Sequence, residues 1–426
     1  MKKKLGKYEL IRKLGDGATS TVYLGRDPFA QRNVAIKVAS PGILRDPEMG
    51  KLYSSLFLNE ASLIGKLNHP HIVQIYDAVV TENLCYIVME YVAGGTLDAY
   101  TEPGCLLPID RVIELIFKCT RALDFAYRLG ITHRDIKPAN ILLAGASDIK
   151  ISDFGAAITN TRNDRTVISG IGSPAYMSPQ QVQEQFLDHR TDIYSLGVVM
   201  HQLLTGALPF SASNNYNMVY QIVNGTPLKP SALRPELPPA LDEIVGRAMA
   251  KEVGDRYPTW QLFAQDLAQA VRKHHSKIRR REFPDTEKFA TLRSLPFFAD
   301  FTDVEIWEAL KFADWQSVAP GSPIMRDGEP GNFFSFVVDG ELTVSKNGTR
   351  LTTLSVGECF GEMAVIRRRG NVRSADVTAE SEACIVSIRG EALKMASESC
   401  RMHFYQGFLD VLANRLALSN QRVAAI

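Results

Sequence analysis

Two short strings in the first half of the chain combine the residue types that phosphoryl transfer needs. His133-Arg134-Asp135-Ile136-Lys137-Pro138-Ala139-Asn140 is followed by Asp153-Phe154-Gly155. A carboxylate beside an attacking hydroxyl can orient it and take its proton, and amide and carboxylate oxygens are ligands that Mg²⁺ prefers. Asp135 suits the first role, and Asn140 and Asp153 suit the second.

A glycine-rich segment and a strand lysine precede these strings. Gly15-Asp16-Gly17-Ala18-Thr19-Ser20-Thr21-Val22 could bring backbone N–H groups close to a triphosphate, although alone it also fits a plain hairpin turn. Val34-Ala35-Ile36-Lys37 then places an ammonium in an apolar strand, where it needs a partner. Glu60, within a helical pattern, is the candidate partner, and a purely structural ion pair fits these two residues equally well.

In this order, the motifs from about Tyr8 to Ala270 resemble the eukaryotic-type Ser/Thr protein kinase catalytic domain. The resemblance implies a bilobal kinase fold that uses ATP and Mg²⁺. It also implies a role for each matching position. The residues that would surround the nucleotide are Gly15, Gly17, Val22 and Ala35, and those that would form the hinge at the adenine are Glu90 and Val92. Lys37 would hold the phosphates of the nucleotide while pairing with Glu60. The catalytic residues would be Asp135 and Lys137, and the Mg²⁺ ligands would be Asn140 and Asp153.

The activation segment shows a departure from the family pattern and carries a regulatory implication. Gln180 stands where the family usually has a glutamate that pairs with an arginine, here Arg256, so a softer activation segment is expected. Arg134 indicates control by phosphorylation of that segment, with Thr166 and Ser169 as the best-placed acceptors. Because the strand lysine and both aspartates are present, an active enzyme is expected rather than a degenerate kinase.

A second group of motifs could bind an anion. Phe360-Gly361-Glu362-Met363-Ala364 precedes an arginine run and Arg373-Ser374-Ala375-Asp376. A short helix near Gly361 could aim N–H groups at an anion that an arginine neutralises. Taken singly, the parts also fit a turn, a carboxylate in a first helical turn and a solvated basic face.

Together these motifs resemble a cyclic nucleotide-binding domain over about Leu295 to Ile426. The resemblance implies that Arg373 and Ser374 contact the cyclic phosphate, that Gly361 and Ala364 offer backbone N–H groups, and that Glu362 holds the ribose 2′-hydroxyl. Asp376 departs from the family, because a carboxylate near a phosphate is unfavourable unless it points away. The alternative is a domain kept for docking or dimerisation without a ligand.

The elements that must position these residues change along the chain. Alternating apolar residues over 8–37 predict strands, and three- and four-residue apolar spacing from Asp110 predicts helices. After Leu295, glycines punctuate short strand-like runs in the rhythm of a small β-roll, and the last 35 or so residues are helical in spacing. The prediction is an α+β protein with a kinase domain over 1–270, a basic linker over 271–294 and a cyclic nucleotide-binding domain over 295–426.

Composition limits the function classes. The chain has 426 residues, 48 Lys and Arg against 47 Asp and Glu, and 45% apolar residues, which excludes disordered and collagen-like classes and argues against nucleic acid as a partner. Its six cysteines are widely spaced, which favours reduced thiols. Without an apolar run of about 18 residues, no membrane span is expected, and we expect a cytoplasmic protein.

The function expected from the sequence is therefore an ATP- and Mg²⁺-dependent Ser/Thr protein kinase, regulated in cis by cAMP or cGMP. Two alternatives stay open: a kinase-fold scaffold with a ligand-free docking or dimerisation domain, and an active kinase whose second domain no longer binds cyclic nucleotide. The basic residues Arg279-Arg280-Arg281 could act as a pseudosubstrate or simply form a solvated helix end.

Overall fold

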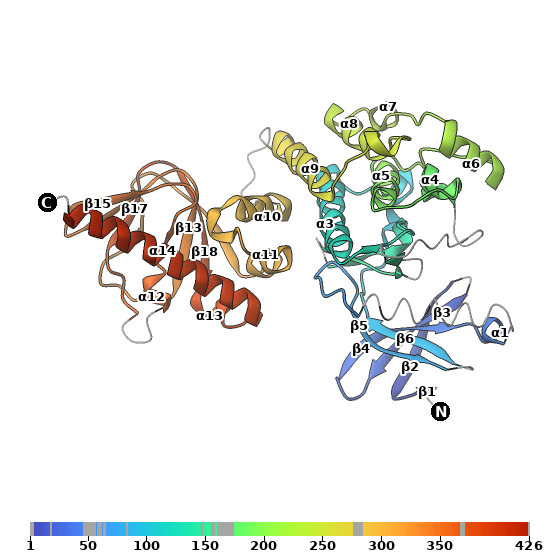
Figure 1. Cartoon of the computed structure of the whole chain (residues 1–426), viewed down its shortest axis with the longest axis horizontal. Helices are drawn as coiled ribbons and strands as arrows, with labels where there is room; N and C mark the ends of the chain where they lie inside the picture. The colour runs from blue at the N-terminus through green and yellow to red at the C-terminus, as the bar shows by residue number, and fades with distance from the viewer. Residues whose placement is uncertain are drawn as a thin grey trace. The chain divides into compact units, whose positions relative to one another are not determined.

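The computed structural model describes residues 4–17, 19–45, 57, 62, 65–81, 84–145, 148–154, 158–159, 174–275, 284–366 and 371–424. The chain divides into two compact units, Met1–Arg279 and Arg280–Ile426. Each unit has its own sheets and helices (Figure 1). The glutamate at 60, the acceptors at 166 and 169 and the arginine runs at 279–281 and 367–369 lie outside the described residues.

The first unit begins with a six-stranded antiparallel sheet in the order β1-β2-β3-β4-β6-β5. Apolar side chains of this sheet form two clusters: Val34 and Ile36 of one strand pack against Tyr8 and Val88, and Ile87 packs in a second cluster. Alternation of side chains across the pleat accounts for the two clusters. The strands are β1 (Lys4–Leu5), β2 (Tyr8–Asp16), β3 (Ser20–Asp27), β4 (Arg32–Ala39), β5 (Ile75–Val80) and β6 (Cys85–Glu90).

The rest of the first unit is mainly helical. The helix α5 (Arg190–Thr205) is buried over nearly its whole length, and it ends at Gly206, whose φ of +75° suits a left-handed C-cap. The helix α3 (Ile109–Arg128) packs on α5 and on α9 (Trp260–His275). The remaining helices are α1 (Pro41–Leu44), α4 (Pro179–Val182), α6 (Asn215–Asn224), α7 (Pro230–Leu233) and α8 (Pro239–Ala248).

Two short antiparallel ribbons frame the segment that carries the first motif. The strand β7 (Ile131–Thr132), which pairs with β10 (Ile158–Thr159), precedes it, and β8 (Ile141–Ala144), which pairs with β9 (Asp148–Ile151), follows it. Between β7 and β8 the chain makes one 3₁₀ turn, Pro138–Asn140. The motif is therefore a short loop with a strand at each end.

The second unit contains a roll of two four-stranded sheets, ordered β11-β18-β13-β16 and β12-β17-β14-β15. Val337, Leu342, Phe360 and Ile385 are among the buried residues of its core. The strands are β11 (Ala313–Val318), β12 (Pro323–Met325), β13 (Phe333–Asp339), β14 (Leu342–Lys346), β15 (Thr349–Leu354), β16 (Cys359–Phe360), β17 (Asp376–Ala379) and β18 (Ala383–Arg389).

Helices flank the roll in the second unit. The helices are α10 (Asp285–Ser294), α11 (Asp303–Leu310), α12 (Met363–Ile366), α13 (Gly390–Leu393) and α14 (Glu398–Ala424). Phe404 and Phe408 of α14 are buried, and their rings contact Phe334 and Phe297. One face of this long helix is thus part of the core of the unit.

The segment 271–294 is largely helical where it is described. The helix α9 continues to His275, and α10 begins at Asp285. The ring of Phe289 on α10 lies 4.6 Å from that of Trp307 on α11, so α10 packs as part of the second unit.

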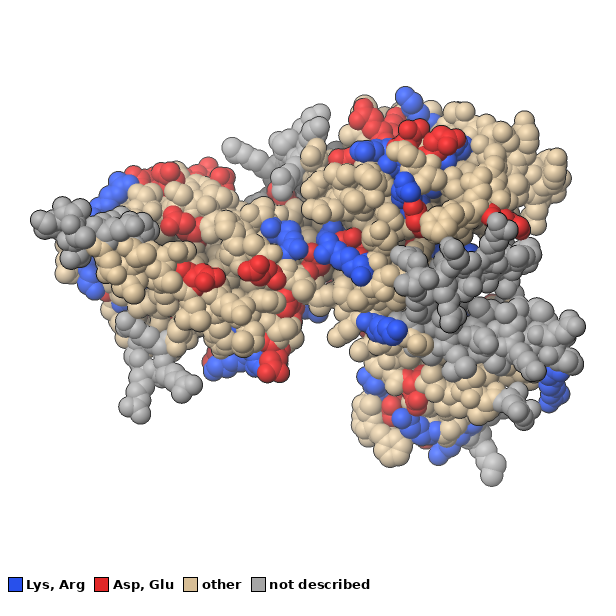
Figure 2. All heavy atoms as spheres, in the orientation of Figure 1, with Lys and Arg blue, Asp and Glu red and all other residues tan. Residues whose placement is uncertain are grey.

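All six cysteines are free thiols, and five of them are buried. Cys105 is the exposed one. No helix in the described part of the chain is long and apolar enough to cross a bilayer. Figure 2 shows basic and acidic side chains on the face in view.

Candidate functional site

The loop between β7 and β8 brings three of the predicted residues together. Asp135 Oδ2 accepts a hydrogen bond from Lys137 Nζ at 2.7 Å and from Asn140 Nδ2 at 3.0 Å. Asn140 Nδ2 also donates to the backbone oxygen of Asp135 at 2.8 Å, which closes the loop on itself. Among the described residues these bonds use only the Nδ2 donor of Asn140, so its Oδ1 remains available to a cation.

A buried aspartate on α5 accepts hydrogen bonds from the backbone of this loop. Asp192 accepts the backbone N–H groups of His133 and Arg134, each at 2.7 Å. Burial raises the pKa of Asp192, against the lowering effect of His133 and of these two N–H donors. Arg134 has a φ of +69°, a left-handed conformation that costs of the order of 1 kcal/mol and persists only where neighbours impose it. The core helix therefore fixes the backbone on which Asp135 stands.

His133 links the loop to the segment before Asp153. Its Nδ1 accepts the backbone N–H of Asp135 at 3.2 Å, so its Nε2 is the atom that donates to the oxygen of Ser152 at 3.0 Å. The imidazole also lies 4.4 Å, ring to ring, from the buried Phe154. The two sequence motifs are thereby joined through one side chain.

Lys37 on β4 meets Asp153 across the same site. Lys37 Nζ lies 2.6 Å from Asp153 Oδ1, and Asp153 has a φ of +63°. Burial opposes ionisation of this carboxyl, but the charge and hydrogen bond of Lys37 hold the pKa of Asp153 below its usual range. Asp153 is therefore a carboxylate at neutral pH, as a ligand of a cation must be.

The predicted nucleotide-contacting residues lie on neighbouring strands of the first sheet. Val22 on β3 pairs with Gly15 on β2 and with Lys37 on β4. Ala35 pairs with Met89, one residue before Glu90 at the end of β6. Gly17 lies in the turn between β2 and β3, where its N–H donates to Ser20. Val92 follows β6 outside regular structure.

Arg134 brings unpaired donors to the same region. Its Nε and Nη1 atoms are buried and have no hydrogen-bond partner among the described residues. Burial lowers the pKa of this guanidinium, against the charge of Asp192. A cation whose buried donors lack partners favours an anion as its partner.

The expected contact between Gln180 and Arg256 is present. Arg256 Nη2 donates to Gln180 Oε1 at 2.6 Å, and the amide of Gln180 donates to the oxygen of Lys251 at 3.1 Å. Arg256 is 1% exposed, and burial lowers its pKa to about 10. The glutamine thus ties α4 to the loop before α9 through a neutral acceptor.

In the second unit, the predicted anion-binding residues converge beside β16. Arg373 is buried, and its Nη1 donates to the oxygen of Gly361 at 2.9 Å. Gly361 has a φ of +78°, and a Cβ there would lie 2.6 Å from Arg373 Nη1, so only glycine fits. Arg373 Nη2 is buried without a partner in the described part of the chain, which leaves one donor for an anion.

Glu362 is fully buried beside this arginine. Arg415 of α14 donates from Nη1 to Glu362 Oε1 at 2.5 Å and from Nη2 to the oxygen of Cys359. Glu362 Oε2 is buried and has no partner among the described residues, so it can accept a hydroxyl hydrogen bond. Sequence reasoning missed Arg415, because nothing in the local pattern connects it to a glutamate 53 residues earlier.

The other predicted residues of this site differ in position. Ala364 lies in α12 and is buried, whereas Ser374 is exposed and its backbone oxygen accepts Lys346 Nζ at 2.9 Å. Asp376 Oδ1 accepts the backbone N–H of Asp327 at 2.9 Å, so this carboxylate is engaged by a turn. Lys346 is a second cation that sequence reasoning did not single out.

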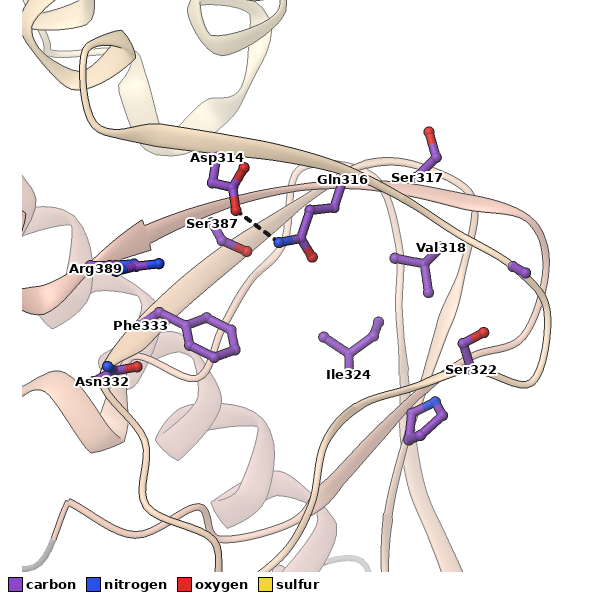
Figure 3. Close-up of a pocket in the computed structure, with 12 residues that line it drawn as sticks. Asp314, Gln316, Ser317, Val318, Ser322, Ile324, Asn332, Phe333, Ser387 and Arg389 are labelled. Atoms are coloured by element: carbon purple, nitrogen blue, oxygen red, sulfur yellow. Dashed lines mark hydrogen bonds between the residues drawn. The ribbon is translucent and has the colours of Figure 1, made fainter. Parts of the chain in front are cut away.

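The roll also contains a cleft of about 600 Å³ between β11, β12 and the start of β13. Figure 3 shows Phe333, Ile324 and Val318 lining it, with the amide of Gln316 donating to Asp314 at 2.9 Å. Neither Glu362 nor Arg373 lines the cleft, although the guanidinium of Arg373 lies 4.4 Å from the ring centre of Phe333. The predicted anion-binding residues therefore lie outside the lining of the cleft, with Arg373 against one of the residues that line it.

Comparison with known families agrees with this geometry. The protein kinase domain family matches residues 8–268, more than half of the chain. The chain belongs to the protein kinase family. The cyclic nucleotide-binding domain family matches residues 315–399, which lie in the second unit. The fold is therefore a kinase domain followed by a cyclic nucleotide-binding domain, as the sequence motifs predict.

The chain is similar to several curated serine/threonine-protein kinases. Serine/threonine-protein kinase PknB of Mycolicibacterium smegmatis is 39% identical over 293 residues, which cover 67% of this chain and 45% of the relative. PknB of Mycobacterium tuberculosis is 40% identical over 279 residues, 64% of this chain and 43% of the relative. PknB of Mycobacterium leprae is 38% identical over 267 residues, which cover 61% of this chain and 42% of the relative. The chain spans less than half the length of these relatives.

Proposed function

We propose that this kinase transfers the γ-phosphate of ATP to Ser and Thr hydroxyls of proteins, and that cAMP or cGMP bound to its second unit regulates the transfer. The observation that carries the first part is the set formed by Asp135, Lys137 and Asn140 on one short loop, with the Lys37–Asp153 pair beside it. A match to the kinase family over residues 8–268 supports the same activity.

Each side chain would have a defined task. Asp135 would orient the attacking hydroxyl and receive its proton, and Lys137, whose Nζ lies 2.7 Å from the Asp135 carboxylate, would balance negative charge on the transferred group. Lys37 would hold the α- and β-phosphates once ATP is bound. Mg²⁺, held by Asn140 Oδ1 and the Asp153 carboxylate, would neutralise phosphate charge. Lys37 and Asp153 are already oriented toward this region by their ion pair.

The remaining predicted contacts would complete the nucleotide site. Gly15, Gly17, Val22 and Ala35 would cover the base and phosphates, and the backbone at Glu90 and Val92 would meet the adenine. The strand pairings of β2, β3, β4 and β6 support this placement. Pairing of Lys37 with Glu60 remains a prediction, because Glu60 lies outside the described residues.

The kinase activity is tested by single substitutions that keep side-chain size. Asp135→Asn should lower phosphate incorporation into a protein substrate by about 10²- to 10⁴-fold, because the amide cannot take the hydroxyl proton. Lys37→Met should also abolish most incorporation. Asp300→Asn, an exposed carboxylate of the second unit, is the matched control and should leave the rate unchanged. If Asp135→Asn and Lys37→Met both retain the full rate, the scaffold alternative holds instead.

Phosphorylation of the activation segment would provide a partner for Arg134. Its buried, unpaired Nε and Nη1 support a phosphate on Thr166 or Ser169, which lie outside the described residues. Mass spectrometric mapping of autophosphorylated protein should find one of these two sites modified. Modification restricted to other residues would contradict this assignment.

Two orphaned atoms support the regulatory ligand. Arg373 Nη2 is a donor suited to a cyclic phosphate, and Glu362 Oε2 is an acceptor suited to a ribose hydroxyl. Gly361 and Ala364 would add backbone N–H groups, and Ser374 its hydroxyl. A ligand would then shift the kinase between a less active and a more active conformation by its differential affinity for the two.

The decisive measurement combines binding and rate. Calorimetric titration with cAMP and cGMP should give binding that Arg373→Ala weakens at least tenfold, whereas Arg350→Ala, an exposed arginine of the same roll, should bind normally. The kinase rate should change with ligand in the wild type and not in Arg373→Ala. Absence of binding would favour a ligand-free second unit, and binding without a rate change would leave the kinase active but unregulated by it.

A further inference from the structure

The cleft in the roll of the second unit has a polar end and an apolar end. Its volume of about 600 Å³ is typical of small-molecule sites. Figure 3 shows the side chains of Asp314, Gln316 and Arg389 at one end. Val318 and Ile324 lie toward the other end. The cleft therefore suits a ligand with a polar group at one end and an apolar group at the other.

The strand register places two opposite charges on one face of the sheet. Asp314 on β11 lies opposite Ser387 on β18, and Phe333 on β13 lies opposite Arg389 on β18. Side chains alternate along a strand, so Ser387 and Arg389 share a face, and Asp314 and Arg389 are diagonal neighbours. Diagonal neighbours on a sheet lie about 7–8 Å apart. Both side chains can therefore reach one small group that lies between them.

These two charged side chains are not paired with each other. Arg389 is exposed, and its guanidinium makes no hydrogen bond or ion pair with another described residue. The Asp314 carboxylate accepts one hydrogen bond, from Gln316 Nε2 to its Oδ2 at 2.9 Å. In the described part of the chain, Asp314 Oδ1 and Gln316 Oε1 are thus available as acceptors. A ligand that carries both a carboxylate and an ammonium would satisfy both charges.

The other end of the cleft would hold an apolar group. Val318, Ile324 and Phe333 pack against the core of the roll but are only partly buried. An apolar ligand that covers these side chains removes apolar surface from water, which favours binding. A small group would leave most of this surface exposed to water. A large apolar group therefore fits this end best.

We propose that this cleft binds a free α-amino acid with a large apolar side chain. The carboxylate of the ligand contacts Arg389, its ammonium contacts Asp314 and Gln316 Oε1, and its side chain covers the apolar end of the cleft. Glu362 and Arg373, which are assigned to the cyclic nucleotide, lie outside the lining of the cleft. Binding of the amino acid therefore does not depend on a bound cyclic nucleotide.

Ligand analogues test the two charged contacts separately. Isothermal titration calorimetry of the full chain should detect binding of L-leucine, L-methionine or L-phenylalanine. Two analogues of the amino acid that binds most tightly are then compared with it: the acid that lacks the ammonium and the amine that lacks the carboxylate. Each should bind at least about tenfold more weakly, because it leaves one charge of the cleft without a partner. Glycine should also bind more weakly, because it has no apolar side chain.

Substitutions that remove one charge test the residues themselves. Arg389→Gln should weaken binding of the amino acid and of the acid but not of the amine. Asp314→Asn should weaken binding of the amino acid and of the amine but not of the acid. Arg350→Gln and Asp300→Asn remove the same charges from exposed positions of the second unit outside the cleft, and both should bind the amino acid as the wild type does.

Folding must be checked beside binding. All four substituted positions are exposed, so the thermal unfolding of each variant should match that of the wild type. Failure of all three amino acids to bind at millimolar concentrations overturns the proposal. So does an acid or an amine that binds as tightly as the matching amino acid. Wild-type affinity in both Arg389→Gln and Asp314→Asn would also overturn it.

Discussion

Arg256 is buried in the first unit, and the acceptors of all its described hydrogen bonds are neutral. Its Nε donates to the backbone oxygen of Ala250, and its Nη1 donates to the backbone oxygen of Arg190. Its Nη2 donates to the backbone oxygen of Lys251 and to Gln180 Oε1. Removing one partner of a buried charged group costs more than the bond contributes, because the group stays desolvated. Removing the side chain of Gln180 should therefore lower the free energy of unfolding by more than the loss of an amide hydrogen bond at an exposed site would.

We predict that Gln180→Ala lowers the free energy of unfolding of the kinase unit by about 2 kcal/mol, because it leaves part of the Arg256 guanidinium without an acceptor. Gln180→Glu should retain at least the wild-type stability, since a carboxylate strengthens the bond to the guanidinium. Urea unfolding followed by the fluorescence of Trp260, in the kinase unit, measures both. Gln183→Ala, at an exposed position of the same segment, is the control, and an equal loss there would contradict the explanation.

At the scale of elements, one glutamate joins the two helices that flank the roll. Glu305 on α11 is 3% exposed; it completes the capping box of its own helix by accepting from the N–H of Thr302 at 2.7 Å. Its Oε1 contacts His403 Nδ1 on α14 at 3.0 Å. Burial alone would raise the pKa of Glu305, but these donors, led by the Thr302 N–H, lower it below the usual value.

The lowered pKa of Glu305 predicts an acid-sensitive second unit. A carboxyl that is more acidic in the folded state stabilises that state above its unfolded pKa of about 4.5, and the stabilisation is lost as the pH falls below that value. Glu305→Gln should be less stable at pH 7 by about 1 kcal/mol and should lose less on acidification. Denaturation followed by the fluorescence of Trp307 and Trp315 at several pH values measures the free energy of unfolding, and Glu341→Gln, at an exposed position, is the control. If the free energy of unfolding falls equally with pH in the wild type and in Glu305→Gln, Glu305 is not the cause of the acid sensitivity.

The elements differ in how far the sequence predicts them. Asp135, Lys137 and Asn140 lie within six residues, so local spacing is enough to bring them together. Sequence spacing cannot reveal the contact between Arg415 and Glu362, which depends on how α14 lies against β16. The helix α10 was also hard to foresee within the segment expected as a linker. It buries only Thr286, Phe289 and Leu292, too few apolar residues for a clear helical period.

At the scale of the whole molecule, the cysteines are distributed over both units. Cys85 and Cys119 are buried in the kinase unit, and Cys359, Cys384 and Cys400 are buried in the second. Burial raises the pKa of Cys384 to about 11 and that of Cys400 to about 12, which suppresses the reactive thiolate further. In the native protein, an alkylating reagent should therefore modify Cys105 and spare the other five.

Because each unit contains buried cysteines, the alkylation of these thiols reports the unfolding of each unit separately. Brief pulses of alkylating reagent at increasing urea, read by peptide mass spectrometry, should label the two buried thiols of the kinase unit together and the three thiols of the second unit together. A buried thiol is alkylated only when the unit around it unfolds. The group of thiols that is alkylated at the lower urea concentration therefore identifies the less stable unit. Mixed labelling, with Cys359 marked before Cys400 and Cys384, would mean that the second unit does not open as one cooperative body.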